Sequence, residues 1–215
     1  MTILFDLDGT LIDSTEAILE SFHNSFDLHH HPHPSDEAIK ALIGHPLDVM
    51  YGELGIETSR VWDFVDTYKA HYREISTQKT VLLPWAREAV EEAAKFARLG
   101  IVTTKTGQYS RILMEHFALM DHFEVLIGRE DVQNPKPHAE PIDRAVEKMK
   151  AAKERCWMIG DTRLDIASAN SAGVRSVGVL SGYDNAEQLK TLTDIIEKDA
   201  YKAVKRIAEL AKISR

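Results

Sequence analysis

The chain has 215 residues, of which 44% are hydrophobic and 28% are charged, and its formal net charge is −8 with histidine counted as neutral. This composition is typical of a soluble globular protein with one large domain, or with a core domain and an insert. The negative charge argues against a surface for nucleic acid or for an anionic membrane, but not against a local basic pocket. Cys156 is the only cysteine, which excludes an intrachain disulfide and is compatible with a reducing cytoplasm.

The first predicted element is a short buried strand at residues 3–5, and acidic residues follow it directly. The apolar run Ile-Leu-Phe leads into Asp6 and Asp8, which have one residue between them. Gly9 then indicates a sharp turn of the backbone. Two carboxylates would therefore lie at the carboxyl end of a strand, where ligands bind in open parallel sheets. A surface turn rich in Asp and Gly is the alternative, and it fits poorly because apolar residues continue at 11–12.

The next part of the chain is predicted to be helical, with no convincing strand between residues 14 and 80. Amphipathic stripes, capping residues and glycine stops predict helices at residues 17–26, 35–42, 47–54 and 59–75. The histidines within residues 29–33 are possible ligands for a transition metal, but the neighbouring prolines favour a solvated loop. Because α/β crossovers are usually shorter, the helical block is expected to be an insert. We predict an α/β core of residues 1–13 and 81–215 with a helical cap of residues 14–80.

From residue 81 the pattern changes to strands that alternate with helices. Gly100 is interpreted as the end of a helix that begins after Pro84 and runs to about Leu99. Strands are expected at residues 101–104, 125–128, 156–159 and 176–179, with a short sixth strand at 194–196. Helices are expected at residues 107–117, at 141–149, before Gly173 and at 199–211. This alternation predicts a doubly wound parallel sheet with a Rossmann-like core and helices on both faces.

Two segments offer groups that suit a phosphoryl ligand. Thr103 and Thr104 end the second predicted strand, where a hydroxyl can donate to a phosphate oxygen. A β-branched strand residue or a helix cap is the alternative for both. Lys136 lies between two prolines that restrict the backbone. A restrained lysine suits the charge of a phosphoryl group or nucleophile, and a solvated loop lysine is the alternative.

A third segment adds carboxylates after the fourth apolar strand. Asp161 and Asp165 are four residues apart and share one face if a helix has begun. Acids at a helix N-terminus often serve only as caps or as partners of the helix dipole. Next to Asp6 they would instead form an oxygen-rich site suited to Mg²⁺.

Taken together, these motifs resemble the haloacid dehalogenase-like hydrolases. Residues 6–10, Asp-Leu-Asp-Gly-Thr, match the first motif in the form that the phosphatases of the family use. The four sites follow the family's order, and the resemblance spans nearly the whole chain, helical cap included. The layout is similar to the phosphoglycolate phosphatase and pyrophosphatase branch, which shares its architecture with β-phosphoglucomutases. One departure is that phosphoglycolate phosphatase-like members commonly have Thr-Asn-Lys where this chain has Thr103-Thr104-Lys105, so the role of the Asn does not carry over.

The resemblance implies a Mg²⁺-dependent phosphatase of small phosphomonoesters, with phosphoglycolate as a candidate substrate. Asp6 would attack phosphorus and form an aspartyl-phosphate, and Asp8 would act as the acid and then as the base. Mg²⁺ would be held by Asp6, by the Asp8 backbone carbonyl and by Asp161, with Asp165 in support.

The same resemblance assigns substrate-binding groups. Thr103 and Lys136 would hold the phosphoryl oxygens, and Thr104 is a further candidate. The loop at Gly44 and His45, between two cap helices, is expected to recognise the leaving group by closing over it. A simple helix-connecting turn is the alternative for this loop.

Other functions remain alternatives to the phosphatase. A phosphomutase of the β-phosphoglucomutase type and a pyrophosphatase are the nearest ones. A 2-haloacid dehalogenase is disfavoured because it needs no metal and normally lacks a second acid at the position of Asp8. A non-catalytic binding or regulatory module is the alternative from a different class. The expected partner is a small phosphorylated metabolite, with neither nucleic acid nor membrane, for a cytoplasmic monomer or homodimer.

Overall fold

A parallel sheet forms the centre of the molecule in the computed structural model, which describes residues 1–213. Its six strands have the order β5-β4-β1-β6-β7-β8, so β1 is central and pairs with β4 on one side and β6 on the other. The chain thus extends the sheet first in one direction and then in the other, which confirms the predicted doubly wound α/β sheet. The strands are β1 (Thr2–Phe5), β4 (Arg98–Val102), β5 (Phe123–Ile127), β6 (Cys156–Gly160), β7 (Arg175–Val179) and β8 (Ile196–Glu197).

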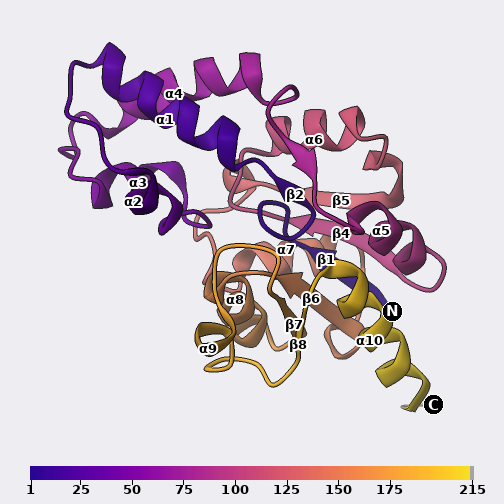
Figure 1. Ribbon diagram of the computed structural model, residues 1–215. Helices are drawn as coiled ribbons and strands as arrows, with labels where there is room; N and C mark the ends of the chain where they lie inside the picture. The colour runs from indigo at the N-terminus through magenta and orange to yellow at the C-terminus, as the bar shows by residue number, and fades with distance from the viewer. Residues whose placement is uncertain (214–215) are drawn as a thin grey trace.

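Helices cover both faces of this sheet, as Figure 1 shows. Side chains alternate along a strand, and in β1 Ile3 and Phe5 join one apolar cluster while Leu4 joins the other. All three side chains are fully buried. Because both faces are covered, the central strands are mostly apolar and do not alternate between apolar and polar residues. One face carries α5 (Ala86–Ala94), α6 (Gly107–His116) and α10 (Ala200–Ile213), and the other carries α7 (Glu140–Lys148) and α8 (Arg163–Ala172).

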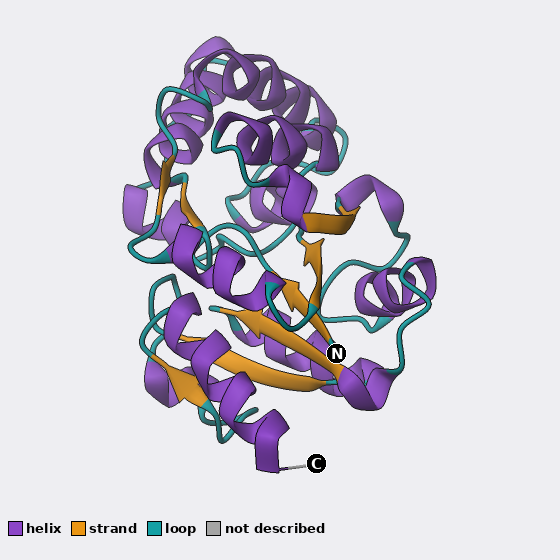
Figure 2. Cartoon of the chain, turned by 90° about the vertical axis from the view of Figure 1, so that its right-hand side faces the viewer, coloured by secondary structure: helices purple, strands orange, loops and turns teal. Residues whose placement is uncertain are grey.

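Four helices form a separate layer, the cap, beside the carboxyl end of β1 (Figures 1 and 2). They are α1 (Thr15–Leu28), α2 (Asp36–Lys40), α3 (Leu47–Glu53) and α4 (Val61–Ile75). The cap has its own aromatic core, in which the ring centroids of Phe22 and Tyr51 are 4.7 Å apart. Such ring pairs contribute about 0.5–1.5 kcal/mol beyond their buried area. The four helices thus pack around a shared apolar cluster, which Tyr109 of α6 also joins.

A short antiparallel sheet lies where the chain enters and leaves the cap. Its strands are β2 (Ile12–Asp13) and β3 (Val81–Leu82), and Ile12 pairs with Leu82. The sequence pattern does not predict this sheet, since two residues are too few to show a period. The pairing holds the two crossings between core and cap side by side.

The predicted helix at residues 84–99 is wrong at its carboxyl end. α5 ends at Ala94, and Arg98 already pairs with Thr2 in the sheet. Gly100 is a strand residue rather than a helix stop: a Cβ there would lie 2.8 Å from side-chain atoms of Leu4 and of a valine on β5. Crowding above the sheet thus explains this glycine. The single turn α9 (Ala186–Leu189) also has no counterpart among the predicted helices.

None of the helices within residues 1–213 has the length and apolar character needed to cross a membrane.

Candidate active site

An acidic cluster lies at the carboxyl ends of two neighbouring strands. Asp6 follows β1 and Asp161 follows β6, and the backbone N–H of Asp6 donates to the carbonyl of Ile159 at 2.9 Å. α8 adds Asp165 from the same connection. One carboxylate oxygen from each of the three acids lies within 4.8 Å of the other two, and all three side chains are buried. The fold thus brings together the three carboxylates that the sequence predicts for a metal site.

This acidic cluster carries more negative charge than its surroundings neutralise. The Nζ atom of Lys136 lies 3.0 Å from Oδ1 of Asp6 and also pairs with Asp165. Burial alone would lower the pKa of Lys136, but the two carboxylates outweigh burial and raise it, so this side chain is an ammonium. The contact with Asp6 lacks hydrogen-bond geometry, which leaves its buried Oδ1 without a hydrogen-bond partner. Three carboxylates therefore face one positive charge.

The pKa values of the cluster express this imbalance. Burial, and then the charge of Asp165, raises the pKa of Asp6 to about 7 against the opposing effect of Lys136. Burial and the same neighbour also raise the pKa of Asp161. A hard divalent cation fits this cluster for three reasons. The buried Oδ1 of Asp6 has no hydrogen-bond partner within residues 1–213, negative charge is in excess, and all the donor atoms are oxygens.

The Asp165 carboxylate has a defined set of protein partners. Its Oδ1 pairs with Lys136, and its Oδ2 accepts from the Thr162 backbone N–H at 3.0 Å and from the Thr162 hydroxyl at 2.7 Å. The Lys136 ammonium also donates to the Val102 carbonyl at 3.2 Å. Asp165 therefore caps α8 and at the same time orients the lysine that faces Asp6.

Asp161 is held by Thr10, which lies in the first motif without an assigned role, and by Tyr183, which sequence reasoning did not single out. Its Oδ1 accepts from the Thr10 hydroxyl and its Oδ2 from the Tyr183 backbone N–H, both at 2.9 Å. Two glycines make room for it, since a Cβ at Gly9 or at Gly182 would lie 2.3 or 1.9 Å from its Oδ2. Gly9 also has a φ of +81°, as the predicted turn requires. No local pattern at residues 181–183 predicts this contact.

Asp8 has a different environment from Asp6. Its Oδ2 lies 3.1 Å from the Nζ atom of Lys105, and its Oδ1 accepts from the Ser14 hydroxyl. The same Nζ atom lies 4.5 Å from the ring centroid of Tyr72 on α4. Burial lowers the pKa of Lys105, but Asp8 and then Tyr72 raise it more strongly. Sequence reasoning did not assign a role to Lys105, and its position directly after the two threonines was the available signal.

The two threonines after β4 point to different parts of the molecule. Thr103 is buried beside β1, and its hydroxyl oxygen accepts from the backbone N–H of Lys105 at 3.2 Å. The Thr104 hydroxyl donates to the backbone carbonyl of Gly44 at 2.8 Å. Thr104 therefore connects the core to the cap loop.

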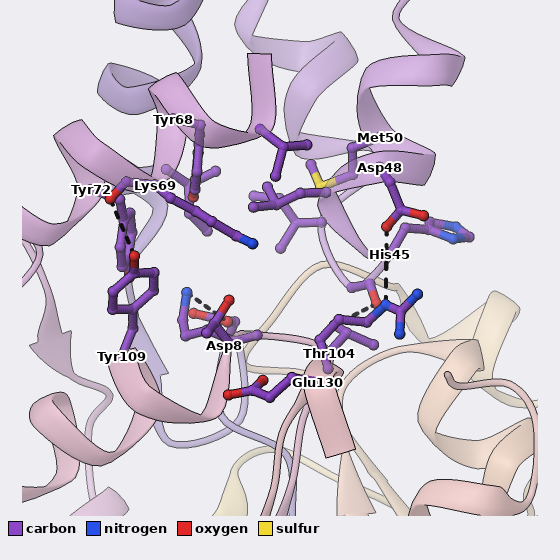
Figure 3. Close-up of a pocket in the computed structure, with 18 of the residues that line it drawn as sticks. Asp8, His45, Asp48, Met50, Tyr68, Lys69, Tyr72, Thr104, Tyr109 and Glu130 are labelled. Carbon is purple, nitrogen blue, oxygen red and sulfur yellow. Dashed lines mark hydrogen bonds and ion pairs between the residues drawn. The ribbon is translucent and has the colours of Figure 1, made fainter. Parts of the chain in front are cut away.

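A cavity of about 240 Å³ separates the cap from the core (Figure 3). Asp8, Thr104 and Lys105 line it from the core, and Gly44 and His45 line it from the cap loop. Much of its remaining wall consists of apolar and aromatic side chains of the cap. The structure therefore brings the predicted cap loop to the same cavity as Asp8.

The histidines at residues 29–33 do not contribute to this cavity. His29 stacks on Phe64 with centroids 4.3 Å apart and hydrogen-bonds the Thr67 hydroxyl at 2.9 Å. His33 contacts His23 through Nδ1 atoms 3.1 Å apart. Across residues 1–213, the acidic cluster is the one group of three or more side chains with suitable metal-ligand spacing. These histidines pack and hydrogen-bond within the cap.

A family model described as haloacid dehalogenase-like hydrolase matches residues 3–179, which include the acidic cluster and the cap. The chain belongs to the haloacid dehalogenase-like hydrolases. This membership confirms the resemblance that the motifs predict.

Similar haloacid dehalogenase-like proteins extend the comparison. The protein named Pyrophosphatase PpaX from Anoxybacillus flavithermus is 33% identical, covering 88% of this chain and 88% of the relative. The protein named "Probable phosphatase IndB" from Dickeya dadantii is 30% identical, covering 94% of this chain and 90% of the relative. The crystal structure of a protein from Bacteroides fragilis, described as a haloacid dehalogenase-like hydrolase, superposes with a TM-score of 0.89 at 28% identity, covering 94% of this chain and 98% of the other. Phosphatase and pyrophosphatase are thus the activities named among similar proteins.

Proposed function

We propose that this hydrolase is a Mg²⁺-dependent phosphatase of small organic phosphate monoesters that works through an aspartyl-phosphate. The observation that carries the proposal is the contrast between Asp6 and Asp8. Asp6 lies in the buried acidic cluster beside Lys136, while Asp8 lines the cavity that faces the cap. One carboxylate is thus suited to attack phosphorus and the other to exchange a proton with the leaving oxygen.

The acidic cluster is the basis for the metal. Mg²⁺ would be held by Asp6, the Asp8 backbone carbonyl and Asp161. Asp165 would support the site through its ion pair with Lys136. When bound, the ion supplies positive charge that offsets the repulsion between the nucleophile and the phosphoryl group. Lys136 and the Thr103 hydroxyl would hold the phosphoryl oxygens, since this reaction depends mainly on position and charge.

Asp8 would serve as the acid that protonates the leaving oxygen and then as the base that activates water. Ser14 and Lys105 contact its two oxygens and fix the orientation of the carboxylate. The Thr104 hydroxyl would act indirectly, by holding the loop of Gly44 and His45 over the leaving group. We expect the enzyme to work in the cytoplasm as a monomer or homodimer on a small phosphorylated metabolite.

A metal and trapping experiment tests the proposal. With p-nitrophenyl phosphate, EDTA should abolish turnover and added Mg²⁺ should restore it. Rapid acid quenching after mixing with a radiolabelled phosphate ester should leave label on the wild-type chain and none on Asp6→Asn. Full activity in metal-free buffer would contradict the metal assignment, and label retained by Asp6→Asn would contradict the nucleophile.

A pyrophosphatase is the second candidate, because the relative from Anoxybacillus flavithermus carries that name. Measuring kcat/KM for inorganic pyrophosphate beside a panel of phosphate monoesters decides between the two. A phosphomutase predicts an isomerised phosphosugar, so stoichiometric phosphate release without isomerisation excludes it.

A further inference from the structure

We propose that the cavity between cap and core binds the leaving group of an organic phosphate monoester with an apolar body of several carbons and an anionic end. This inference rests on the proposed phosphatase function and defines its substrate class. It makes inorganic pyrophosphate and phosphoglycolate poor substrates, although they are the substrates suggested by the relatives and by the resemblance.

The cavity lies on the leaving-group side of the reaction centre. Its lining includes Asp8, but not Asp6, Lys136 or Asp161. The phosphoryl subsite is therefore additional to this volume, and Asp8 lies at the boundary between the two. A leaving oxygen at Asp8 would direct the rest of its molecule into the cavity.

The size of the cavity exceeds what a very small leaving group needs. Its volume of about 240 Å³ is many times the roughly 10–15 Å³ that a single water molecule requires. A glycolate or phosphate leaving group would leave much of this space unfilled. A chain or ring of several carbons with a terminal group matches it better.

The wall that faces the core is strongly apolar. Ile18, Ile43, Met50 and Val65 line it and are each less than one-tenth exposed. Tyr68 adds an aromatic face from α4, as Figure 3 shows. A phosphate leaving group would lose hydration against these four aliphatic side chains, which offer it no hydrogen bonds in return, and this loss is costly. An alkyl or aryl body would instead gain from leaving water.

The charged groups that line the cavity differ in their partners, and the buried Nε of Arg129 has no hydrogen-bond partner from residues 1–213. Asp8 pairs with Lys105 at 3.1 Å, and Arg129 lies 4.0 Å from Asp48. Both Glu130 carboxylate oxygens accept from a backbone N–H on α6, at 3.0 and 2.9 Å.

Lys69 is the cation of the lining that has no carboxylate within ion-pair distance among the described residues. In Figure 3 its side chain extends from α4 into the cavity. Across the part of the chain that the structure describes, Lys69 forms no ion pair, and its Nζ atom lies 6.0 Å from the Trp62 ring centroid. An ammonium that borders an apolar cavity without a carboxylate partner suits an anionic group on the ligand. Lys69 would therefore receive the end of the leaving group that is distant from phosphorus.

A series of alkyl phosphates tests this assignment, because their leaving oxygens have similar basicity. Ethyl, butyl and hexyl phosphate, 6-phosphonooxyhexanoate and pyrophosphate are assayed with Mg²⁺. We expect kcat/KM to rise about fourfold for each added methylene that is buried. The hexanoate should exceed hexyl phosphate several-fold, and pyrophosphate should be the poorest. Calorimetric titration of Asp6→Asn with the same compounds should give the same order of affinity without turnover.

Two cavity variants test the wall and the cation separately. Lys69→Met should remove the advantage of the hexanoate and leave hexyl phosphate as good or better. Leu47→Trp, which fills the cavity from α3, should lower the hexyl-to-ethyl ratio of kcat/KM about tenfold or more. Val49→Trp is the matched control, because Val49 lies on the same helix, is 39% exposed and does not line the cavity, and its ratios should equal those of the wild type.

The outcomes separate the two proposals. A flat dependence on chain length, a preference for pyrophosphate, or an unchanged hexanoate advantage in Lys69→Met would overturn the inference while the hydrolase function stands. Absence of turnover on every compound would overturn the proposed function and the inference that rests on it. If Leu47→Trp fails to fold in a thermal denaturation check, Lys69→Met and the wild-type series still decide the result.

Discussion

At the residue scale, two aspartates of one motif have separate partners. Asp6 faces Lys136 and two further acids, whereas Asp8 faces Lys105 and Ser14 at the edge of the cavity. The chain leaves β1 after Phe5, and the backbone turns at Gly9, where φ is +81°. Neighbouring positions in the chain thereby receive different electrostatic surroundings, which is how paired carboxylates take different roles.

Replacing Asp8 by Asn should separate the two steps of the proposed reaction. Asp6 would still accept a phosphoryl group from p-nitrophenyl phosphate, whose leaving group needs little protonation. The second step would lack its base, so we expect a burst of nitrophenol near one equivalent of enzyme and then turnover about 10²–10⁴-fold slower than wild type. With an alkyl phosphate the first step should also be slow. Stopped-flow absorbance and intact-protein mass measure both effects, with Asp6→Asn as the variant that gives no burst. Wild-type turnover of an alkyl phosphate by Asp8→Asn would remove Asp8 from the mechanism.

Replacing Gly182 by Ala should displace Asp161. The added Cβ would lie 1.9 Å from Oδ2 of Asp161, so the carboxylate or the loop must move. We expect a loss of about 1–3 kcal/mol in the free energy of unfolding and weaker Mg²⁺ binding. Urea denaturation and a Mg²⁺ titration measure the two effects.

Gly52→Ala is the matched control for that substitution. Gly52 lies in α3, and a Cβ there would have no neighbouring atom within 4 Å. Because alanine favours a helix over glycine, this variant should be neutral or more stable by up to about 1 kcal/mol. Equal changes in the free energy of unfolding and in Mg²⁺ binding for Gly182→Ala and Gly52→Ala would contradict the steric argument.

At the scale of elements, the end of β4 connects the core to the cap loop between α2 and α3. The link is the hydrogen bond from the Thr104 hydroxyl to the Gly44 carbonyl. This loop also packs near the start of α8, since a Cβ at Gly44 would lie 3.2 Å from the Thr162 side chain. The loop that borders the cavity is thus positioned by two strand ends of the core.

Thr104→Val should loosen that connection while keeping the shape of the side chain. Loss of the hydroxyl leaves the Gly44 carbonyl without its donor, which costs about 0.5–1.5 kcal/mol in the free energy of unfolding. If the loop orders the leaving group, kcat/KM for a large alkyl phosphate should fall several-fold more than for ethyl phosphate. Thr104→Ser keeps the donor and should restore both values. An identical loss for both substrates would restrict Thr104 to a structural role.

At the scale of the whole molecule, two apolar interiors meet at the acidic cluster and the cavity beside it. The sheet with its helices forms one interior and the cap forms the other, and β2 and β3 join them. The buried acidic cluster and the cavity both lie at the carboxyl end of the sheet, beneath the cap. Folding therefore brings carboxylates together in a place where water cannot fully stabilise them.

The free energy of unfolding of the metal-free protein should depend on pH through this cluster. Asp6 has a folded-state pKa of about 7 against an ordinary value of 3.8. Between these values the folded state holds more protons than the unfolded chain, so this contribution lowers stability as pH rises through the window. Mg²⁺ requires the deprotonated carboxylates, so its stabilising effect should be larger above about pH 7 than near pH 5. Thermal denaturation with and without Mg²⁺ measures both trends.

Asp6→Asn is the control for the pH dependence, because it removes the shifted group and nearly preserves its shape. As pH rises from 3.8 to about 7, the free energy of unfolding of Asp6→Asn should fall less than that of the wild type. A wild-type profile identical to that of Asp6→Asn would show that other groups control the titration.

Local pattern in the sequence was sufficient for most of the elements, though not for β2, β3 and α9, and it pointed to the carboxylates that the fold brings together. Apolar runs followed by Asp6, Thr103 and Asp161 predict carboxyl ends of parallel strands, and those ends meet at one edge of the sheet. Periodicity also predicts the helical insert, since it depends on neighbours a few residues apart. The same local reasoning failed at Gly100, where a glycine that resembles a helix stop is explained by side chains packed above the sheet.

Only the tertiary structure decided the contacts that join distant parts of the chain. Ser181 donates to the Gly9 carbonyl across 172 residues of sequence, and Thr104 reaches Gly44 across 60. The strand order, the Lys105 contact with Asp8 and the apolar cavity likewise depend on how the elements pack. Such contacts leave no periodic signal, because each depends on the relative placement of whole elements rather than on the order of neighbouring residues. The sequence by itself therefore determined which reaction chemistry to expect, and packing decided which group each carboxylate faces and which side chains line the cavity.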